Sequence, residues 1–365
     1  MAAQTEDGWA DFCKALANAG SILRGEGVPT HPIDQAEGLR YLSRLTRVAL
    51  ESIVECADVD FPRLFKMTDD TIKIGGDNPD NIYWNATIAG DRDYRISGQR
   101  GTVPYLSFGT KANRFAIDGR MASTGELEDA AIHFSDDGAF EIIVSQRPHP
   151  GNWLPMSADT SMLLVRQTFH DKASEQPASL KIERLGQAVR PAPLAPSVIE
   201  ARLKNAAAFV AGTSKAFADW TRMFMAHPNA LLPWEQSIFQ NVGGDPNIHY
   251  LHGYWRLKPG EAWVIETEVP DCRFWNFVLQ NWWMESGDYL HNPNSWLNPA
   301  KAAMPNGRRL RIVVAEEDRD FDNWIDTGRH REGTALLRWI SAEQHPVPSC
   351  RVVALDALSS SSLQR

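Results

Sequence analysis

One short loop near the C-terminus brings an acid, a base and a cation together. Asp326, His330, Arg331 and Glu332 lie within a seven-residue stretch. A histidine held by a carboxylate can act as a general acid or base, and a neighbouring arginine can bind a substrate oxygen. The spacing predicts His330 as the acid–base group, held by Asp326 or Glu332, with Arg331 on the substrate. The alternative is a polar loop in which Asp326 caps a turn and Arg331 pairs with Glu332.

A Trp-rich segment surrounds this loop. Nine of the thirteen tryptophans fall between Trp234 and Trp339, interleaved with histidine and carboxamide residues. Indoles beside amide side chains are typical of a wall that holds a flat or apolar molecule. The alternative is that the indoles form the core of a β-sandwich. The predicted ligand-binding residues are Trp282, Asn276, Gln280, Trp255, Trp324, Arg331, Tyr83, Trp84 and His249.

Alternation along residues 274–283 divides this segment, because successive side chains of a strand point to opposite faces. Trp275, Phe277 and Leu279 are expected in the core, with Trp263 and Trp339. Asn276, Val278, Gln280 and Trp282 are expected on the other face. A buried amide without a partner costs about 1–3 kcal/mol, which a polar ligand or water would offset. The alternative is that this second face is simply solvated.

Two other groups of residues resemble metal ligands in type. His249 and His252 are three residues apart, but their neighbours predict a strand, on which they face opposite sides. A shared metal is therefore not expected, and either imidazole can face a pocket, so His252 joins the candidate acid–base residues. Asp77, Asp80 and Asn81 fit a turn that bonds its own backbone better than a calcium loop. No metal is predicted.

Composition narrows the possible partners. The net charge is −9, with Lys+Arg 37 against Asp+Glu 46, which argues against nucleic acid or an anionic membrane. The first residues lack the basic and apolar regions of a signal peptide, and the four cysteines are too scattered for a disulfide framework, so a cytoplasmic location is expected. No phosphate-loop lysine, dinucleotide-binding spacing or nucleophile elbow occurs, so no organic cofactor is predicted.

Apolar periodicity predicts an α+β fold dominated by β-structure, with two sandwich-like units. Ser197 is the expected N-cap of a helix from about residue 198 to 226, between the two units. The predicted parts are a helical N-terminal segment (1–70), a first β-unit (71–190), a Pro-rich linker and helix (191–233), a Trp-rich β-sandwich (234–358) and a disordered tail (359–365).

One stretch of sequence is echoed later in the chain. The turn at 75–81 runs Gly-Gly-Asp-Asn-Pro-Asp-Asn before Ile82 and Tyr83, and the turn at 243–247 runs Gly-Gly-Asp-Pro-Asn before Ile248. Both turns are predicted to open a strand. The echo therefore indicates two β-units built on a similar beginning, unless two polar turns coincide by chance.

The chain resembles the family called domain of unknown function 1214 over most of its length beyond residue 60. The resemblance rests on the segments at 76–80, 94–96 and 151–155, and more specifically on Trp282-Trp283 and on Asn323-Trp324-Ile325-Asp326-Thr327 with the residues that follow. It implies a β-sandwich and a small residue at position 329, where this chain has Arg. It implies no established activity.

The sequence predicts a small-molecule enzyme. The expected reaction is that of a lyase or hydrolase, by acid–base chemistry, on an apolar and aromatic or polycyclic substrate bound between the two β-units. The candidate catalytic residues are His330, Glu332, Asp326 and His252. The alternative is a non-catalytic module that binds carbohydrate or lipid. The sequence leaves open whether the chain forms a homo-oligomer.

Overall fold

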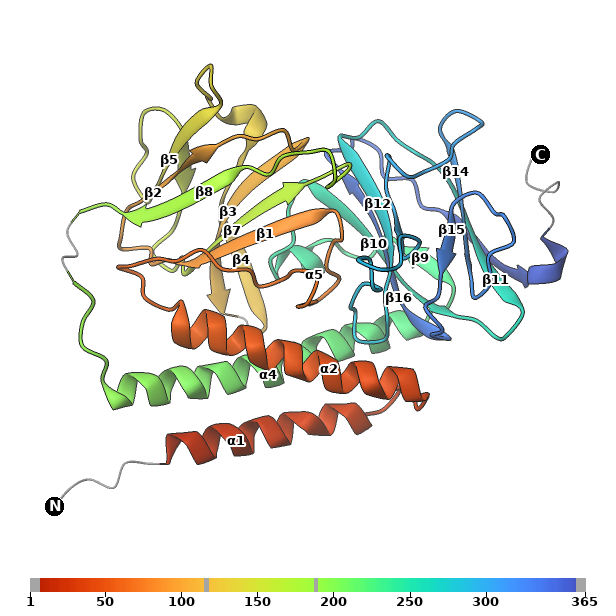
Figure 1. Ribbon diagram of the computed structural model, residues 1–365, viewed down its shortest axis with the longest axis horizontal. Coiled ribbons are helices and arrows are strands. Elements are labelled where there is room, and N and C mark those ends of the chain that lie inside the picture. The colour runs from red at the N-terminus through yellow and green to blue at the C-terminus, as the bar shows by residue number, and fades with distance from the viewer. Residues whose placement is uncertain (1–6, 115–117, 187–189, 359–365) are drawn as a thin grey trace.

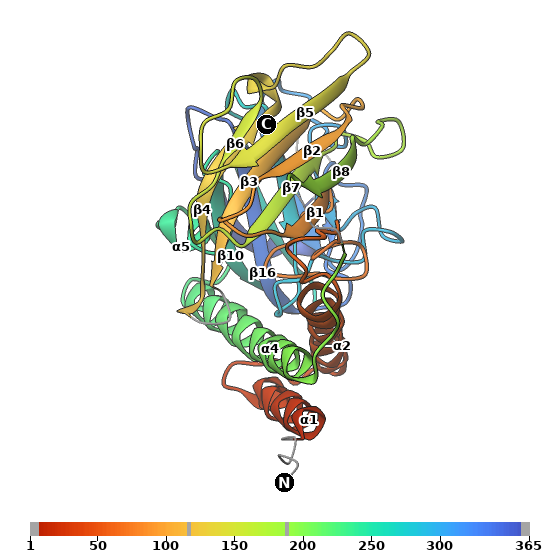
Figure 2. The same cartoon turned by 90° about the vertical axis from the view of Figure 1, so that its left-hand side faces the viewer.

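The computed structural model describes residues 7–114, 118–186 and 190–358. Two β-units lie side by side, and three long helices run along one side of both (Figures 1 and 2). This architecture confirms the predicted β-dominated α+β fold, with two sandwich-like units, a helical N-terminal segment and a helical connector. The predicted disordered tail, 359–365, lies outside the described residues.

The helices come from two parts of the chain. Helix α1 (Gly8–Ala19) leads through a 3-10 turn (Gly20–Arg24) to α2 (Pro32–Ala49), which continues as a π-helical turn (Leu50–Glu55). The connector is α4 (Pro196–Met225), which packs against both N-terminal helices. No helix among the described residues is both long and apolar enough to cross a membrane.

Helix α4 starts slightly earlier than its sequence suggested. Its N-cap is Ala195 and its first residue is Pro196, so the predicted cap at Ser197 is wrong. Proline fits the first helical position because its fixed φ is helical and its missing N–H would have no partner there. The Pro-rich linker therefore ends inside the helix.

The first β-unit consists of two four-stranded sheets, ordered β1-β7-β3-β4 and β6-β5-β2-β8. A short 3-10 turn (Asp129–Ala131) lies between β4 and β5. The strands are β1 (Asn81–Thr87), β2 (Tyr94–Gln99), β3 (Tyr105–Arg114), β4 (Arg120–Glu128), β5 (Ala139–Ser145), β6 (Trp153–Pro155), β7 (Met162–Thr168) and β8 (Ser179–Arg184).

The second β-unit repeats this plan, with sheets ordered β10-β16-β12-β13 and β15-β14-β11-β17. Between α4 and this unit lie β9 (Ala230–Leu232) and the short helix α5 (Ser237–Gln240), and a 3-10 turn (Leu355–Ala357) follows it. The strands are β10 (Ile248–Arg256), β11 (Glu261–Glu268), β12 (Phe274–Leu279), β13 (Trp296–Leu297), β14 (Arg309–Ala315), β15 (Trp324–Asp326), β16 (Glu332–Ile340) and β17 (Ser349–Ala354).

The two units match strand for strand. Adding nine to each strand label of the first unit reproduces both sheet orders of the second, including the parallel pairs β5·β6 and β14·β15. The two echoing turns lie just before β1 and β10, the corresponding first strands. The echo in the sequence therefore marks a structural repeat.

Each unit buries an apolar core between its own two sheets. Trp275, Trp263 and Trp339 lie in the core of the second unit with Phe277 and Leu279, as alternation predicted. A further apolar cluster joins the helices to the outer face of β10 and β16. Each unit therefore has a core of its own, and a further core is shared with the helices.

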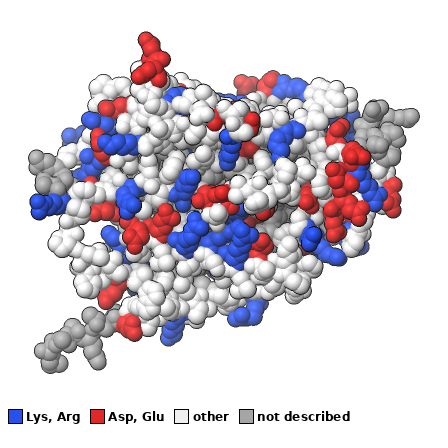
Figure 3. Space-filling model, in the orientation of Figure 1, with Lys and Arg blue, Asp and Glu red and all other residues white. Residues whose placement is uncertain are grey.

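Charges of both signs are mixed over the molecular surface. On the face shown in Figure 3, Lys and Arg side chains gather near the middle, and Asp and Glu side chains are prominent at one end. An open groove between the units is lined by Lys66, Lys172 and Lys301, and the ammonium groups of Lys172 and Lys301 already donate to backbone carbonyls. The groove therefore offers few uncommitted cations.

Candidate functional site

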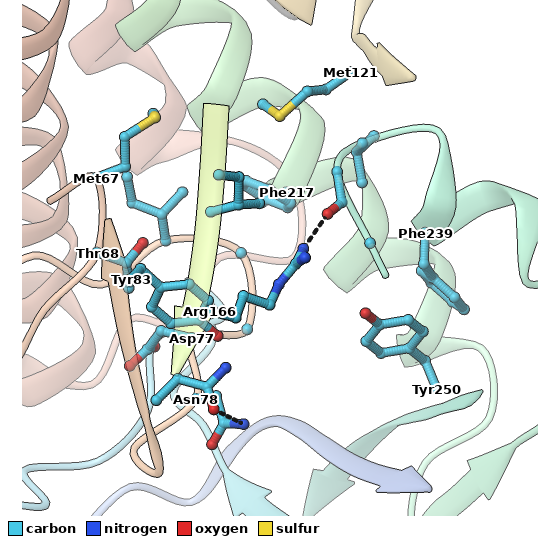
Figure 4. A pocket seen from close by; sticks show the side chains of 18 of the residues that line it. Met67, Thr68, Asp77, Asn78, Tyr83, Met121, Arg166, Phe217, Phe239 and Tyr250 are labelled. Carbon is cyan, nitrogen blue, oxygen red and sulfur yellow. Dashed lines mark hydrogen bonds between the residues drawn. The ribbon is translucent and has the colours of Figure 1, made fainter. Parts of the chain in front are cut away.

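A cavity of about 180 Å³ lies where the two β-units and helix α4 meet. We call it the central cavity. For scale, an apolar cavity of about 150 Å³ is large enough to bind benzene. Figure 4 shows side chains from both units and from α4 around it. Its apolar walls are formed by Met67, Ile74, Met121, Met162, Leu164, Phe209, Phe217, Trp220, Phe239, Val242, Ile248 and Leu336.

Strand alternation explains which residues face the cavity. Every second residue of β1 (Asn81, Tyr83, Asn85) lines it, while Ile82 and Trp84 between them pack on the sandwich core. In the second unit β10 supplies residues 248, 250 and 252 in the same way. The cavity thus uses the outer faces of two sheets whose inner faces form the cores.

The repeat places two Tyr–Arg pairs at this cavity. Tyr83 lies opposite Arg166 in the β1·β7 pair, and Tyr250 lies opposite Arg338 in the β10·β16 pair. Each arginine reaches across to the glycine turn of the other unit. Arg166 Nη2 donates to the carbonyl oxygen of Gly243 at 2.5 Å, and Arg338 Nη2 donates to that of Gly76. The two units therefore hold each other at the cavity wall.

One of these turns also passes tightly beneath α4. Gly75 has φ +59°, and a Cβ on it would lie 2.2 Å from the ring of Phe217. Only glycine combines this left-handed backbone with such a close approach. The Gly-Gly sequence therefore fixes how closely the turn and α4 enclose the cavity.

Two buried polar atoms of the wall have no hydrogen-bond partner among the residues that the structure describes. They are Nδ1 of His252 on β10 and Oγ1 of Thr213 on α4, and both side chains are almost fully buried. Buried polar groups are normally paired, since an unpaired one costs about 1–3 kcal/mol. A bound molecule that offered polar groups to these atoms would remove that cost.

Burial controls the protonation of the cavity residues. It lowers the pKa of His252 well below 6.5, and the positive charge of Arg338 lowers that pKa further. Burial raises the pKa of Tyr250 to about 12 and also raises the pKa of Tyr83. At neutral pH the imidazole and both phenols are therefore uncharged, and His252 can donate at one nitrogen and accept at the other.

A second, more polar pocket of about 160 Å³ lies between α2 and the second unit. We call it the α2 pocket. Four sequence-predicted residues line it: His330, Asp326, Gln280 and Trp255. Here His330 is held by Asp34, the acidic residue in the first turn of α2, with Nδ1 and Oδ1 2.6 Å apart. The sequence could not indicate this partner because 296 residues separate the two side chains.

The predicted catalytic loop does not form one site, and the expected pairing of His330 with Asp326 or Glu332 is wrong. Asp326 accepts from the backbone N–H of Gly328 and from Asn292, so it caps the turn as the alternative proposed. Glu332 binds Tyr254 and Arg256, and the Arg331–Glu332 pair of that alternative is absent from the ion pairs of the described residues. Arg331 is exposed.

Position 329, in the middle of this loop, carries Arg with φ +69°. A side chain there is strained, because the left-handed conformation brings Cβ close to the backbone. The family resemblance implied a small residue at this position.

Trp282 lines none of the three pockets described, so its role as a pocket residue stays a prediction. Strand β12 ends at Leu279, and the alternation that placed Trp282 beside Gln280 ends with it. Trp282 and Trp283 instead dock the helices. The carbonyl of Trp282 accepts from Thr221 on α4, and the ring of Trp283 stacks on Tyr41 of α2.

Four other predicted ligand-binding residues have structural partners and line none of these pockets. The indole of Trp324 donates to the Ala315 carbonyl, and His249 stacks on His345, on the opposite face of β10 from His252. Trp84 packs against the first core. Asn276 is buried and links Arg338 to the turn of the first unit. Tyr83 and His252 are the predicted residues that do line the central cavity.

The turn residues Asp77 and Asp80 join the units instead of bonding their own backbone as predicted. The carboxylate of Asp77 accepts from the backbone N–H and hydroxyl of Ser286 at 2.8 and 2.6 Å. Asp80 accepts from Asn276, Trp296 and Asn298, all in the second unit. Among the described residues, no group of three His, Cys, Asp or Glu side chains is arranged to hold a metal ion.

Arg166 and Arg338 were missed at the sequence level, although a signal was present. Each is a lone charged residue after a run of buried apolar residues, Met162 to Val165 in β7 and Ala335 to Leu337 in β16. A charge inside a fully buried strand requires a specific partner. The same signal at matching places in both units would have pointed to the central cavity.

Comparison with known proteins places the chain in a family. No family model and no curated protein matches it. The crystal structure of an uncharacterized protein from Burkholderia cenocepacia is 48% identical, with a TM-score of 0.94 over 96% of this chain and 98% of that one. The chain belongs to the family of this Burkholderia protein.

A more distant solved structure shares the fold alone. The VPA0106 protein from Vibrio parahaemolyticus is 10% identical, with a TM-score of 0.50 over 93% of this chain and 100% of that one. Neither relative carries a stated activity. Membership of domain of unknown function 1214, a cytoplasmic location and a homo-oligomer all stay predictions.

Proposed function

We propose that the protein binds a small, mainly apolar molecule in the central cavity and acts on it by acid–base chemistry, as a lyase or hydrolase. The observation that carries this proposal is the unpaired Nδ1 of His252, buried in an otherwise largely apolar wall. A neutral imidazole in such a place can accept a proton from a bound substrate or donate one to it. His252 is the proposed acid–base residue.

The alternative is a non-catalytic module that binds carbohydrate or lipid, and its carbohydrate form has less support. Such modules stack sugars on aromatic side chains exposed on an open face. Among the large hydrophobic side chains that are exposed in the described residues, the one aromatic is Trp9, at the start of α1. The other indoles are buried or half-buried, which favours an enclosed site.

Ligand binding can be tested by thermal shift with small aromatic compounds, comparing two variants of α4. Thr213→Phe fills the cavity, whereas Ala211→Phe adds the same ring on the exposed side of the same helix. A ligand at a hundred times its Kd stabilises by about 2.7 kcal/mol. We expect this shift in the wild type and in Ala211→Phe, and its loss in Thr213→Phe. An equal shift in all three proteins would contradict binding in the central cavity.

The catalytic part is tested once a compound is turned over. His252→Gln is expected to lower kcat by at least about a hundredfold, the usual contribution of general acid–base catalysis, with the thermal shift retained. Exposed His133→Gln is the control. If His330→Gln removed turnover and His252→Gln did not, the chemistry would belong to the α2 pocket.

A further inference from the structure

Arg338 is a buried cation whose partners are all neutral. Its side chain is 4% exposed and lines the central cavity. The guanidinium donates to Oδ1 of Asn276 at 3.3 Å and to the carbonyl oxygen of Gly76. Among the described residues, no carboxylate oxygen lies within 4.0 Å of the guanidinium nitrogens of Arg338, the distance that defines an ion pair. Its positive charge is therefore hydrogen-bonded without being neutralised by a direct partner.

The structural repeat supplies an internal comparison. Arg166 occupies the matching place in the first unit, and its Nη1 lies 3.3 Å from Oδ2 of Asp245 in the turn of the second unit. The corresponding carboxylate for Arg338 is that of Asp77, but both of its oxygens accept hydrogen bonds from Ser286. The repeat thus neutralises one arginine and leaves the other without a carboxylate.

The charge of Arg338 acts on the polar groups of the cavity. It lowers the pKa of His252, and it opposes the rise in pKa that burial causes at Tyr83 and Tyr250. Asn276 holds the guanidinium in place, because its own amide donates to Asn78 and Asp80. A fixed cation that has no carboxylate in direct contact is a ready binding site for an anion.

We infer that the molecule bound in the central cavity carries a carboxylate and that Arg338 binds this group. The inference rests on the proposed binding function and adds the class of ligand. One uncompensated positive charge matches the single negative charge of a carboxylate, and a guanidinium matches its planar geometry. Apolar walls around about 180 Å³ suit a ring of about the size of benzene beside it. The ligand class is therefore a small apolar monocarboxylic acid.

Benzoate and benzamide test this inference, because they differ in charge and hardly in shape. Calorimetric titration of the unmodified protein near neutral pH is expected to give a Kd for benzoate about tenfold or more below that for benzamide. In Arg338→Gln the preference is expected to fall to about twofold or less, and Arg338→Lys, which keeps the charge, should retain part of it.

Several results would overturn it. Equal affinities for the two compounds on the unmodified protein would refute the carboxylate and leave binding in the cavity standing. A preference that survives in a folded Arg338→Gln would refute the role of Arg338. If neither compound bound, or if Thr213→Phe failed to block them, the proposed function would fall together with this inference.

Discussion

Arg166 and Arg338 show one residue type in two electrostatic settings within a single protein. Both are buried, both face the central cavity and both lie opposite a tyrosine in the neighbouring strand. Of the two, Arg166 alone has a carboxylate of the described residues in contact, that of Asp245. A paired buried charge and an unpaired one should respond differently to removal of the arginine.

Stability measurements on the two neutral variants test this difference. Arg166→Gln leaves Asp245 buried without its cation and should lower the free energy of unfolding by about 3–5 kcal/mol. Arg338→Gln removes an uncompensated charge together with its hydrogen bonds to neutral acceptors. Its free energy of unfolding should therefore fall by about 1 kcal/mol. Urea unfolding measures both. Equal losses would show that Arg338 is neutralised as fully as Arg166.

His252 also predicts how stability depends on pH. In the unfolded chain it takes up a proton below about pH 6.5, whereas burial keeps it neutral in the folded protein. Acid therefore favours the unfolded state, and the free energy of unfolding attributable to His252 falls as the pH decreases through about 6.5. At about pH 5.5 the loss should be roughly 1 kcal/mol.

This contribution is read as a difference between proteins, because other buried groups titrate as well. Burial raises the pKa of Glu285 to about 7, although Arg44 opposes this rise. The free energy of unfolding that Glu285 contributes therefore falls as the pH rises from the usual pKa of a glutamate towards 7. The loss of stability in acid should therefore be smaller in His252→Gln than in the wild type and unchanged in His133→Gln. An identical loss in all three would mean that His252 is protonated in the folded protein.

At the scale of elements, an Asn–Trp pair lies at matching places in both units, where the connection after a long strand ends. Asn152 and Asn323 precede the short strands β6 and β15, and each side chain bonds one backbone N–H and two carbonyls. The next residue, Trp153 or Trp324, donates its indole N–H to a carbonyl at the end of the preceding long strand. The pair thus fixes a parallel contact that a free loop would not keep.

Asn323→Ala tests the structural role of this pair. It leaves one N–H and two carbonyls without their partner, so we expect a loss of about 2–3 kcal/mol in the free energy of unfolding. Asn306→Ala, at an exposed position in the same unit, is the control. Chemical denaturation measures both, and a loss no larger than that of the control would remove the pair from the framework of the unit.

The sequence predicted the elements that have a clear period and missed those that do not. Alternation placed Trp275, Phe277 and Leu279 of β12 in the core, where they lie. Strands β6, β13 and β15 are two or three residues long, too short to show a period. The extension of β12 to Trp283 failed because a turn with Met284 at φ +57° follows its end, and an apolar segment can be a turn as well as a strand.

The candidate site was predictable in part. A position between the two units was expected, and Tyr83 and His252, which line the cavity, were among the predicted residues. The partner of His330 was not predicted, since Asp34 lies in a helix that packs there only in the folded protein. The roles of Arg166 and Arg338 depend on contacts between the units, which no local pattern encodes.

At the scale of the whole molecule, the repeat and the helices together create the cavity. Each sandwich is complete in itself, with a core between its sheets. The outer faces of β1·β7 and β10·β16 are not part of these cores, and they meet around the central cavity beside α4 (Figure 4). A site built from both units explains why the turn of each one is fastened to the other by an arginine.

The central claim is that this cavity holds a small apolar carboxylic acid. A crystal structure of the protein with benzoate tests it most directly. The account predicts electron density for benzoate inside the central cavity, with its carboxylate on the guanidinium of Arg338 and its ring against the apolar wall under α4. Benzoate bound in the α2 pocket or on the surface, with the central cavity empty of it, would contradict the claim.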